Sequence, residues 1–275
     1  MQSIFNDVYA VADAQRLRVW TGAGARDYVG EPAFAAEHGG DPAVALATVL
    51  GALPKVRGAF RNRLYLRIGH PWAHAAVLPW QSGLWSESAW QAYARALFET
   101  RALRVPLAVR VAYARFGHAR LAVALHDDVL RACAEVSRAA GWRLAGCRDA
   151  LSAALSVALS AALQPQRVSL GTGDYRFVLL QPGVVTCLFR CEGEWRDAVT
   201  LPRHAGQQLG DLIGAAALMC GQPPDGQTVV STLDAHEYIE GRIDVRIDVR
   251  DGQDDARVYD GGAPPLDRLR AGVAA

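Results

Sequence analysis

The sequence predicts an α/β protein whose sheets contain both parallel and antiparallel strands. Segments with alternating apolar and polar residues, typical of strands, are interspersed with segments in which apolar residues recur every three or four positions, typical of helices. The elements follow one another as hairpin, helix, strand and helix, and this order occurs twice before a run of strands. A chain of 275 residues that is 51% apolar and 21% charged can form a sizeable core. Together these observations are typical of an α/β fold with mixed sheets.

The first half opens with a predicted β-hairpin. Its strands, Val8–Ala12 and Arg16–Trp20, flank the short turn Asp13–Gln15. Glycines between Gly22 and Gly40 predict loops, and Asp41 followed by proline predicts a helix start. The other elements expected up to residue 100 are the helix Ala43–Leu53, the strands Leu64–Ile68 and His74–Leu78, and a helix that begins at Ser86.

The middle of the chain repeats the hairpin–helix–strand–helix order. Two strands are expected at Leu107–Ala114 and Ala119–Leu125, and a helix that starts at Asp127 should end at Gly141. The remaining expected elements are the strand Trp142–Cys147, the helix Ala150–Leu163, the strands Arg167–Leu170, Tyr175–Gln181, Val184–Cys191 and Trp195–Leu201, the helix Gly206–Cys220, the strand Thr228–Ser231 and a half-exposed strand over the tandem repeat Ile243–Arg250.

Composition excludes several classes of function. The net charge of +1, from 29 basic and 28 acidic residues, lacks the basic excess of a nucleic-acid-binding protein. Lys55 is the only lysine, which argues against Schiff-base chemistry and a P-loop. The five cysteines are scattered, as expected in a reducing compartment. The longest apolar run, Ala150–Leu163, has about 14 residues where a bilayer requires roughly 20. We therefore expect a cytoplasmic protein without direct membrane insertion.

Several segments resemble the cytoplasmic domains of the PilM family of type IV pili and the GspL family of type II secretion. The similarity covers roughly residues 8–231, and it is carried by Leu64–Ile68, Leu78–Thr100, Gly117–Leu125 with the helix that follows, Arg143–Ala145 and Val184–Trp195. The resemblance implies an actin-like fold, in which two ribonuclease-H-like halves flank a cleft. The first subdomain would span residues 1–163, with an inserted hairpin–helix unit near 104–148. The second would span 164–275, with a C-terminal strand and a frayed tail.

The same resemblance implies where a nucleotide site would lie, and the residues there depart from the pattern. Actin-like nucleotide binders have two Asp-x-Gly turns that hold phosphates and metal, because glycine admits backbone N–H groups and aspartate holds Mg²⁺. The first turn here keeps Asp13 but has Gln15 in place of glycine. The second would be Ser169–Gly173, in which Ser169 replaces aspartate before Gly171, Thr172 and Gly173. We therefore expect a degenerate site that binds neither ATP nor Mg²⁺.

These expectations favour a non-enzymatic scaffold that binds protein partners, such as an inner-membrane assembly protein, in a pilus or secretion platform. The chain would then reach the inner membrane only through its partner, and a homodimer is left open. Four tryptophans follow one another at Trp72, Trp80, Trp85 and Trp90. Core packing is their simplest interpretation, and an aromatic partner groove is the functional one.

Two enzymatic alternatives are carried forward. The first is an actin-like ATPase with altered phosphate loops. The second is a metal-dependent enzyme of ribonuclease-H-like fold, which would need acidic residues on its first strand, and Val8–Ala12 has none. His70 and His74 have the spacing of a helical metal pair, but Pro71 opposes a helix and no third ligand is evident. We therefore expect neither catalytic residues nor a metal site.

Overall fold

The computed structural model describes residues 5–22, 31–58, 61–101, 103–162, 174–223, 226–232 and 257–258. Its elements in chain order are β1 (Asn6–Ala12), β2 (Arg16–Thr21), β3 (Phe34–Glu37), α1 (Pro42–Ala52), β4 (Asn62–Ile68), β5 (Ala73–Leu78), α2 (Glu87–Thr100), β6 (Leu107–Val111), β7 (Arg120–His126), α3 (Asp127–Ala139), β8 (Arg143–Asp149), α4 (Ala150–Ala162), β9 (Tyr175–Gln181), β10 (Val184–Cys191), β11 (Glu194–Pro202), α5 (Leu209–Met219), β12 (Gln227–Thr232) and β13 (Arg257–Val258).

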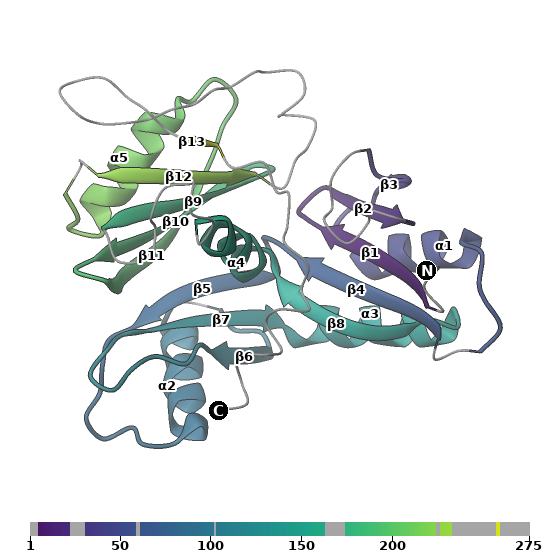
Figure 1. The fold of residues 1–275 in the computed structure, drawn as a ribbon, viewed down its shortest axis with the longest axis horizontal. Helices are drawn as coiled ribbons and strands as arrows, with labels where there is room; N and C mark the ends of the chain where they lie inside the picture. Colours follow the sequence, from purple (N-terminus) through teal and green to yellow (C-terminus); the bar gives the residue numbers. More distant parts are fainter. Residues whose placement is uncertain are drawn as a thin grey trace.

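Two five-stranded sheets share one topology (Figure 1). The first has the order β3-β2-β1-β4-β8 and the second β11-β10-β9-β12-β13. In each sheet, two consecutive strands form an antiparallel hairpin: β1 with β2, and β9 with β10. The first strand of each hairpin also pairs with a parallel strand on its other side, β4 or β12. The predicted fold class, α/β with two halves and mixed sheets, is therefore confirmed.

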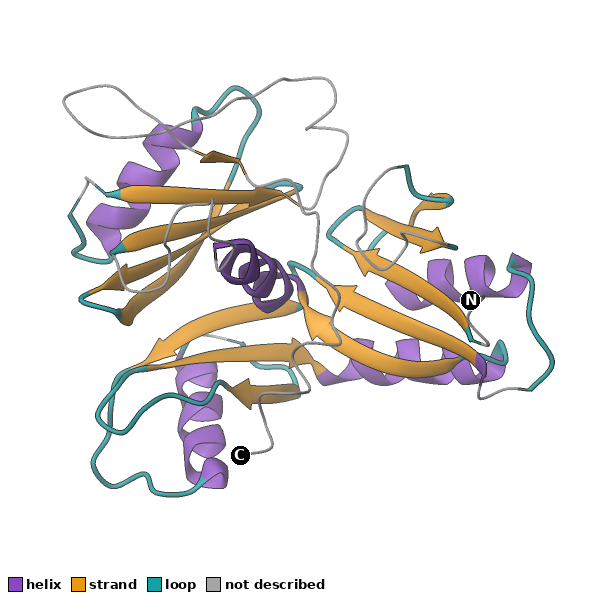
Figure 2. Cartoon of the chain, in the orientation of Figure 1, coloured by secondary structure: helices purple, strands orange, loops and turns teal. Residues whose placement is uncertain are grey.

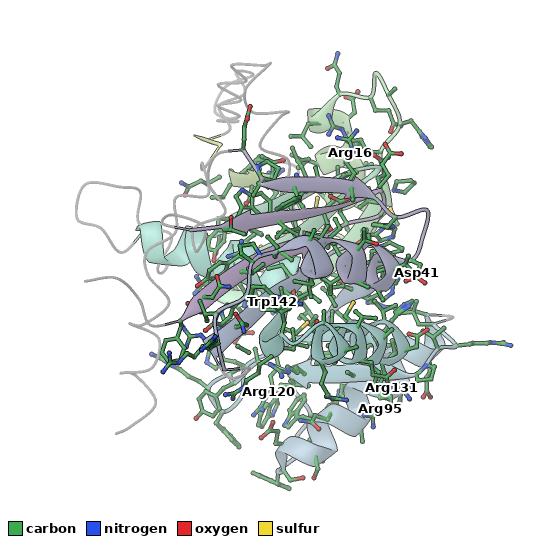
Figure 3. All side chains as sticks on the ribbon, turned by 90° about the vertical axis from the view of Figure 1, so that its right-hand side faces the viewer. Arg16, Asp41, Arg95, Arg120, Arg131 and Trp142 are labelled. Carbon is green, nitrogen blue, oxygen red and sulfur yellow. The ribbon has the colours of Figure 1, made fainter. Side chains whose placement is uncertain are left out.

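Helices cover these sheets in layers (Figure 2). Side chains of α1, α3 and the first sheet form one core, to which α1 contributes Leu46, Val49 and Leu50. The Trp142 indole N–H donates to the carbonyl of Leu50 at 3.2 Å, which ties the start of β8 to α1. Figure 3 shows α1, which begins after Asp41, directly above α3, which carries Arg131. A second core joins α5 to the second sheet.

Helix α4 lies between the two halves (Figure 2). Its apolar residues Leu151 and Leu155 pack with Phe177 and Leu188 of the second sheet and with Leu121 of β7. Asp149, the last residue of β8, accepts a hydrogen bond from the Ser152 backbone N–H at 2.6 Å and so caps α4. A single helix thus continues from the first sheet and packs on the second.

A third sheet, of order β5-β7-β6, carries α2 on one face. Strands β6 and β7 of this sheet come from the segment 104–148 that was predicted to be an insert. Strand β5, which begins at Ala73, joins the same sheet because it pairs with β7. The predicted boundary at 163 and 164 lies outside the described residues.

Most predicted elements are present, with one addition. The stretch expected to be only loop between Gly22 and Gly40 contains the edge strand β3, which pairs antiparallel with β2. Its sequence, Phe-Ala-Ala-Glu, has little β-propensity, so pairing along β2 and not its own composition makes it a strand. All five cysteines are free. The predicted strands Arg167–Leu170 and Ile243–Arg250 lie outside the described residues.

Candidate functional site

The shared topology identifies equivalent positions in the two halves. Corresponding strand residues have corresponding partners: Ala12 pairs with Leu17 and Ile68, and Leu180 pairs with Val185 and Thr232. The residue that follows Ala12 is Asp13, and the residue that follows Leu180 is Gln181. Both are almost fully buried, at 1% and 7% exposure. Asp13 and Gln181 therefore occupy the same place, at the turn of the first hairpin of each half.

The equivalence adds a second hairpin turn to the one at Asp13–Gln15. By strand register this turn is Gln181–Pro182–Gly183, where Gly183 has a φ of 75°. The predicted second phosphate turn, Ser169–Gly173, lies outside the described residues and stays a prediction. The dipeptide Pro-Gly marks a turn in the sequence, but its counterpart in the first half becomes apparent only from the strand pairing.

The Asp13 carboxylate is fully engaged within its own hairpin. Its Oδ1 accepts from the backbone N–H groups of Gln15 and Arg16, at 3.0 and 2.9 Å. Its Oδ2 accepts from the Arg18 guanidinium at 2.7 Å, and both side chains of this ion pair are buried. His38 Nε2 lies 2.7 Å from the Asp13 carbonyl oxygen. A buried carboxylate is stable here because a buried arginine neutralises it.

Gln181 bonds across to the other half. Its Oε1 accepts from the backbone N–H of His70, directly after β4, at 2.8 Å. Gly69 lies so close that an added Cβ would overlap Oε1, so a larger residue here would force the Gln181 amide to move. An amide that crosses the cleft thus stands at the place where the first half has a carboxylate.

A small cleft separates the two turns. Its cavity, of about 250 Å³, is lined by Asp13, Gln15, Arg16, Leu180, Gln181, Pro182, Gly183 and Thr232. Small-molecule sites usually have volumes of roughly 300–1,000 Å³, so this cleft is small for a nucleotide. Its one carboxylate is neutralised by Arg18, and Gln181 contributes no charge. The predicted residues Asp13 and Gln15 therefore line the cleft. They give a metal ion no free carboxylate, because Asp13 is paired with Arg18.

Three histidines meet beside this cleft, a grouping that the sequence analysis missed because it considered only His70 and His74. His74 Nε2 lies 3.1 Å from Nε2 of His126, and the His70 and His74 rings are 6.5 Å apart. Burial lowers the pKa of all three, and the pKa of His74 falls to about 4. Within the described part of the chain, no group of three His, Cys, Asp or Glu side chains is placed to hold a metal ion.

A larger groove of about 680 Å³ lies along the third sheet, and the sequence analysis gave no sign of it. Its floor is apolar and comes from β6 and β7, with Val109, Leu121 and Val123 among the lining residues. Its polar lining consists of Arg95, Arg110, Arg148, Asp149 and Ser152. Burial raises the pKa of Asp149, which favours its neutral form relative to an exposed carboxyl group. The groove is therefore apolar with a positive rim.

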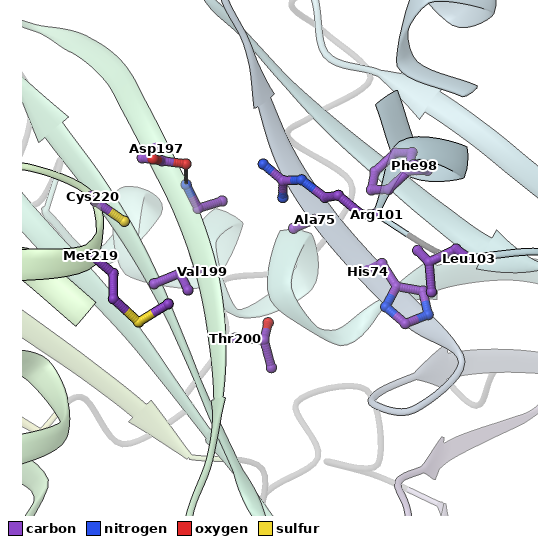
Figure 4. Close-up of a pocket in the computed structure, with 11 residues that line it drawn as sticks. His74, Ala75, Phe98, Arg101, Leu103, Asp197, Val199, Thr200, Met219 and Cys220 are labelled. Carbon is purple, nitrogen blue, oxygen red and sulfur yellow. Dashed lines mark hydrogen bonds between the residues drawn. The ribbon is translucent and has the colours of Figure 1, made fainter. Parts of the chain in front are cut away.

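A third cavity, of about 320 Å³, lies between the third sheet and the second half (Figure 4). Arg101, at the end of α2, extends toward Asp197 of β11, with Phe98 and Leu103 behind it and Met219 opposite. Within strand β11, Asp197 Oδ1 accepts a hydrogen bond from the Ala198 backbone N–H at 2.7 Å.

The four tryptophans proposed as a groove do not come together. Trp72 is buried in the core of the first sheet, beside the His38 ring at 5.2 Å. Trp90 is buried in the core of the third sheet, and half-buried Trp80 packs on it with ring centroids 5.7 Å apart. Trp85 alone is strongly exposed. Trp72 thus has a packing role, and the others gather around α2.

Comparisons with known proteins agree with this architecture. No protein-family model matches the chain, and no curated protein is similar in sequence. A Bacteroides thetaiotaomicron protein described as having an actin-like ATPase fold superposes with a TM-score of 0.54 at 9% identity, over 97% of this chain and 95% of the other. The PilM–PilN type IV pilus biogenesis complex gives 0.54 at 11% identity, over 85% and 83%. The cytoplasmic domain of EpsL, an inner membrane component of the Vibrio cholerae type II secretion system, gives 0.49 at 12% identity, over 83% and 82%.

At sequence identities of 9–12%, structural similarity shows only that two proteins share a fold. The two TM-scores above 0.5 show that this chain shares its fold with those two structures. The superpositions extend over 97% and 85% of this chain, so they include both five-stranded sheets. No described helix is long and apolar enough to cross a membrane. The chain therefore has the actin-like ATPase fold, and the predicted resemblance to PilM-type domains is confirmed at the level of that fold.

Proposed function

We propose that this chain is a non-enzymatic actin-like scaffold that holds a segment of a protein partner and does not use ATP. The observation that carries the proposal is the internal bonding of both hairpin turns: Asp13 to Arg18, and Gln181 to His70. The Asp13 carboxylate and the Gln181 side-chain oxygen thus have their hydrogen-bond partners within the chain.

The chemistry of magnesium and phosphate explains why this bonding opposes nucleotide binding. Mg²⁺ in phosphate sites is held through one or two carboxylates, and phosphates bind backbone N–H groups that are otherwise free. Among the described residues that line this cleft, Asp13 is the one carboxylate, and it would have to give up its buried guanidinium partner. The N–H groups of Gln15 and Arg16 already donate to Asp13. Nucleotide binding would therefore have to break bonds that are present in the folded chain.

The groove along β6 supports the binding part of the proposal. Strand β6 is an edge of the third sheet, so alternate backbone groups point away from β7 and are available to an added strand. Arg95, Arg110 and Arg148 are exposed at its rim, and no carboxylate in the described ranges forms an ion pair with them. An extended segment with apolar residues toward β6 and acidic residues toward the rim fits this groove. The solved PilM–PilN complex shows a protein of this fold with a protein partner, and we propose that the partner of this chain is an inner-membrane assembly protein.

Calorimetry with ATP and Mg²⁺ tests the first part. We expect no saturable heat up to millimolar nucleotide and no phosphate release. Binding with a micromolar dissociation constant would contradict the proposal and support the ATPase alternative.

Site-specific photocrosslinking in cells tests the second part. A photoreactive residue at Ala112, at the end of β6, should capture one defined protein, and Arg110→Glu should reduce that capture. The control position is Leu218 on α5, which is 79% exposed on the second half and should capture nothing specific. Equal labelling from Ala112 and Leu218 would exclude the groove as the binding site.

A further inference from the structure

Two loops form an exposed aromatic surface at one end of the third sheet. We call it the aromatic tip and define it by Trp80 and Trp85, between β5 and α2, and Tyr113 and Phe116, between β6 and β7. Trp85, Tyr113 and Phe116 are 76%, 91% and 73% exposed. Figure 1 shows both loops at the lower left, beyond the ends of the strands. Aromatic rings exposed together in this way mark an interaction surface.

Three rings of the tip, those of Trp80, Trp85 and Phe116, contact one another and rest on the core. Phe116 packs edge-on against Trp80, with centroids 4.6 Å apart, and stacks with Trp85 at 6.0 Å. Trp80 rests on buried Trp90, whose indole N–H donates to the Leu84 carbonyl at 2.9 Å. The tip is therefore a supported surface, and its exposed rings do not fold back onto the protein.

The charge of the two loops is positive. Residues 79–86 and 112–120 contain Arg115, His118 and Arg120 and no aspartate or glutamate. Arg115 is exposed, while Arg120 lies over the Trp90 ring at 4.5 Å. The acidic side chain that touches the loops, Glu194, is bonded to His118 at 2.8 Å. Glu87, the first residue of α2, is exposed two residues after Trp85, so the exposed charges next to the rings are those of Arg115 in the loop and Glu87 at the helix start.

We infer that the aromatic tip rests on the anionic surface of a phospholipid bilayer, with its rings at the level of the headgroups. Tryptophan and tyrosine favour that interface because one part of each ring system is apolar and another forms hydrogen bonds. Arginine adds attraction to anionic lipid. A protein partner would need a pocket matched to these rings, whereas a bilayer accepts a convex surface, and the three cavities described above are lined by other residues. This inference is independent of the proposed scaffold function, and it adds direct contact where the sequence predicted contact only through a partner.

Co-sedimentation of the full chain with vesicles tests the inference. We expect binding to phosphatidylethanolamine vesicles that contain phosphatidylglycerol, little binding to pure phosphatidylcholine, and weakening by salt. Trp85→Ala with Phe116→Ala should abolish binding, and Arg115→Ala should weaken it about five-fold. The matched control is Leu218→Ala with Met219→Ala on α5, a pair 79% and 67% exposed, which should bind as the wild type does.

Because Trp85 is exposed, its substitutions leave the core intact, and circular dichroism verifies folding. Trp85→Phe should keep vesicle binding and lose part of the blue shift in tryptophan fluorescence that anionic vesicles induce. Absence of binding to anionic vesicles overturns the inference, and so does undiminished binding by the folded double variant. A concentration-dependent dimer that ignores vesicles and is lost in Trp85→Ala would assign the tip to a protein interface instead.

Discussion

The two five-stranded sheets have the same strand order, yet their first hairpins end in different chemistry. The first hairpin holds a buried ion pair, Asp13 with Arg18, inside one half. The second places Gln181 at the equivalent position and directs it to the backbone of His70 in the other half. Topology is thus retained in both halves, while the residues at the cleft bond to the chain itself. The comparison shows that one strand topology can carry different residues at equivalent turns.

The largest effect should come from breaking the first hairpin's ion pair. Arg18→Met leaves the Asp13 carboxylate buried without its guanidinium partner, so we expect a loss of about 3–5 kcal/mol in the free energy of unfolding. Urea denaturation measures it. At the equivalent position of the second half, Thr186 lies 3.0 Å from the Thr200 hydroxyl, and Thr186→Val should cost only about 1 kcal/mol.

Two controls define that result. Arg16→Ala alters an exposed arginine on the same strand and should change stability by less than about 0.5 kcal/mol. Arg18→Met combined with Asp13→Asn should recover part of the loss, because no charge then remains buried. A cost below about 1 kcal/mol for Arg18→Met would show that Asp13 does not depend on Arg18.

The second hairpin's bond across the cleft should be the next most sensitive. Gly69→Ala places a methyl group against Gln181 Oε1, so the amide must move, and we expect a cost of about 1–3 kcal/mol. Hydrogen exchange should become faster at the His70 N–H. Gly51→Ala in α1 is the matched control: open space surrounds it, and a helical alanine should stabilise by about 0.5–1 kcal/mol. Unchanged exchange at His70 would contradict the role given to Gln181.

Acidification should lower the free energy of unfolding through the half-buried histidines His70, His74 and His126. The pKa of His74 is lowered to about 4 by burial and by the neighbouring His126 and His70. In the unfolded chain the His pKa is about 6.5, so the unfolded state binds more protons between these values and stability falls as pH decreases through that window. After allowance for solvent screening we expect a loss of about 1–2 kcal/mol. Denaturation at pH 7 and pH 4 measures it; His74→Gln should flatten the dependence, and exposed His204→Gln should not.

The smallest effect should come from the N-caps of α1 and α5, the helices that follow the antiparallel strands of each half. Asp41 caps α1 by accepting from the N–H groups of Ala43 and Val44, whereas Gln208 gives α5 no side-chain cap. Asp41→Ala should therefore cost about 1 kcal/mol, and Gln208→Asp should gain about 0.5–1 kcal/mol. The midpoint of thermal unfolding, measured for both variants and the wild type, tests these two values. Destabilisation by Gln208→Asp would mean that the α5 N-terminus tolerates no added carboxylate.

The sequence predicted the elements well and the site less well, for a physical reason. Apolar periodicity reports which face of an element is buried, so helices and most strands were recognisable, whereas β3 exists only through its pairing with β2. The equivalence of Asp13 and Gln181 depends on strand register, which no local pattern contains. The groove along β6 likewise combines residues from six elements. Trp72 and Trp85 share a residue type, yet one is buried and the other exposed.

The hydrogen bond from His70 to Gln181 has a consequence for timing. In a protein whose halves close around a nucleotide, the duration of the closed state is set by hydrolysis and release. Here the groups that face the cleft are joined by the chain's own backbone and side chains as soon as it folds. If the proposed function holds, the partner groove is available at a constant level, and the number of active scaffolds depends on how many copies the cell makes.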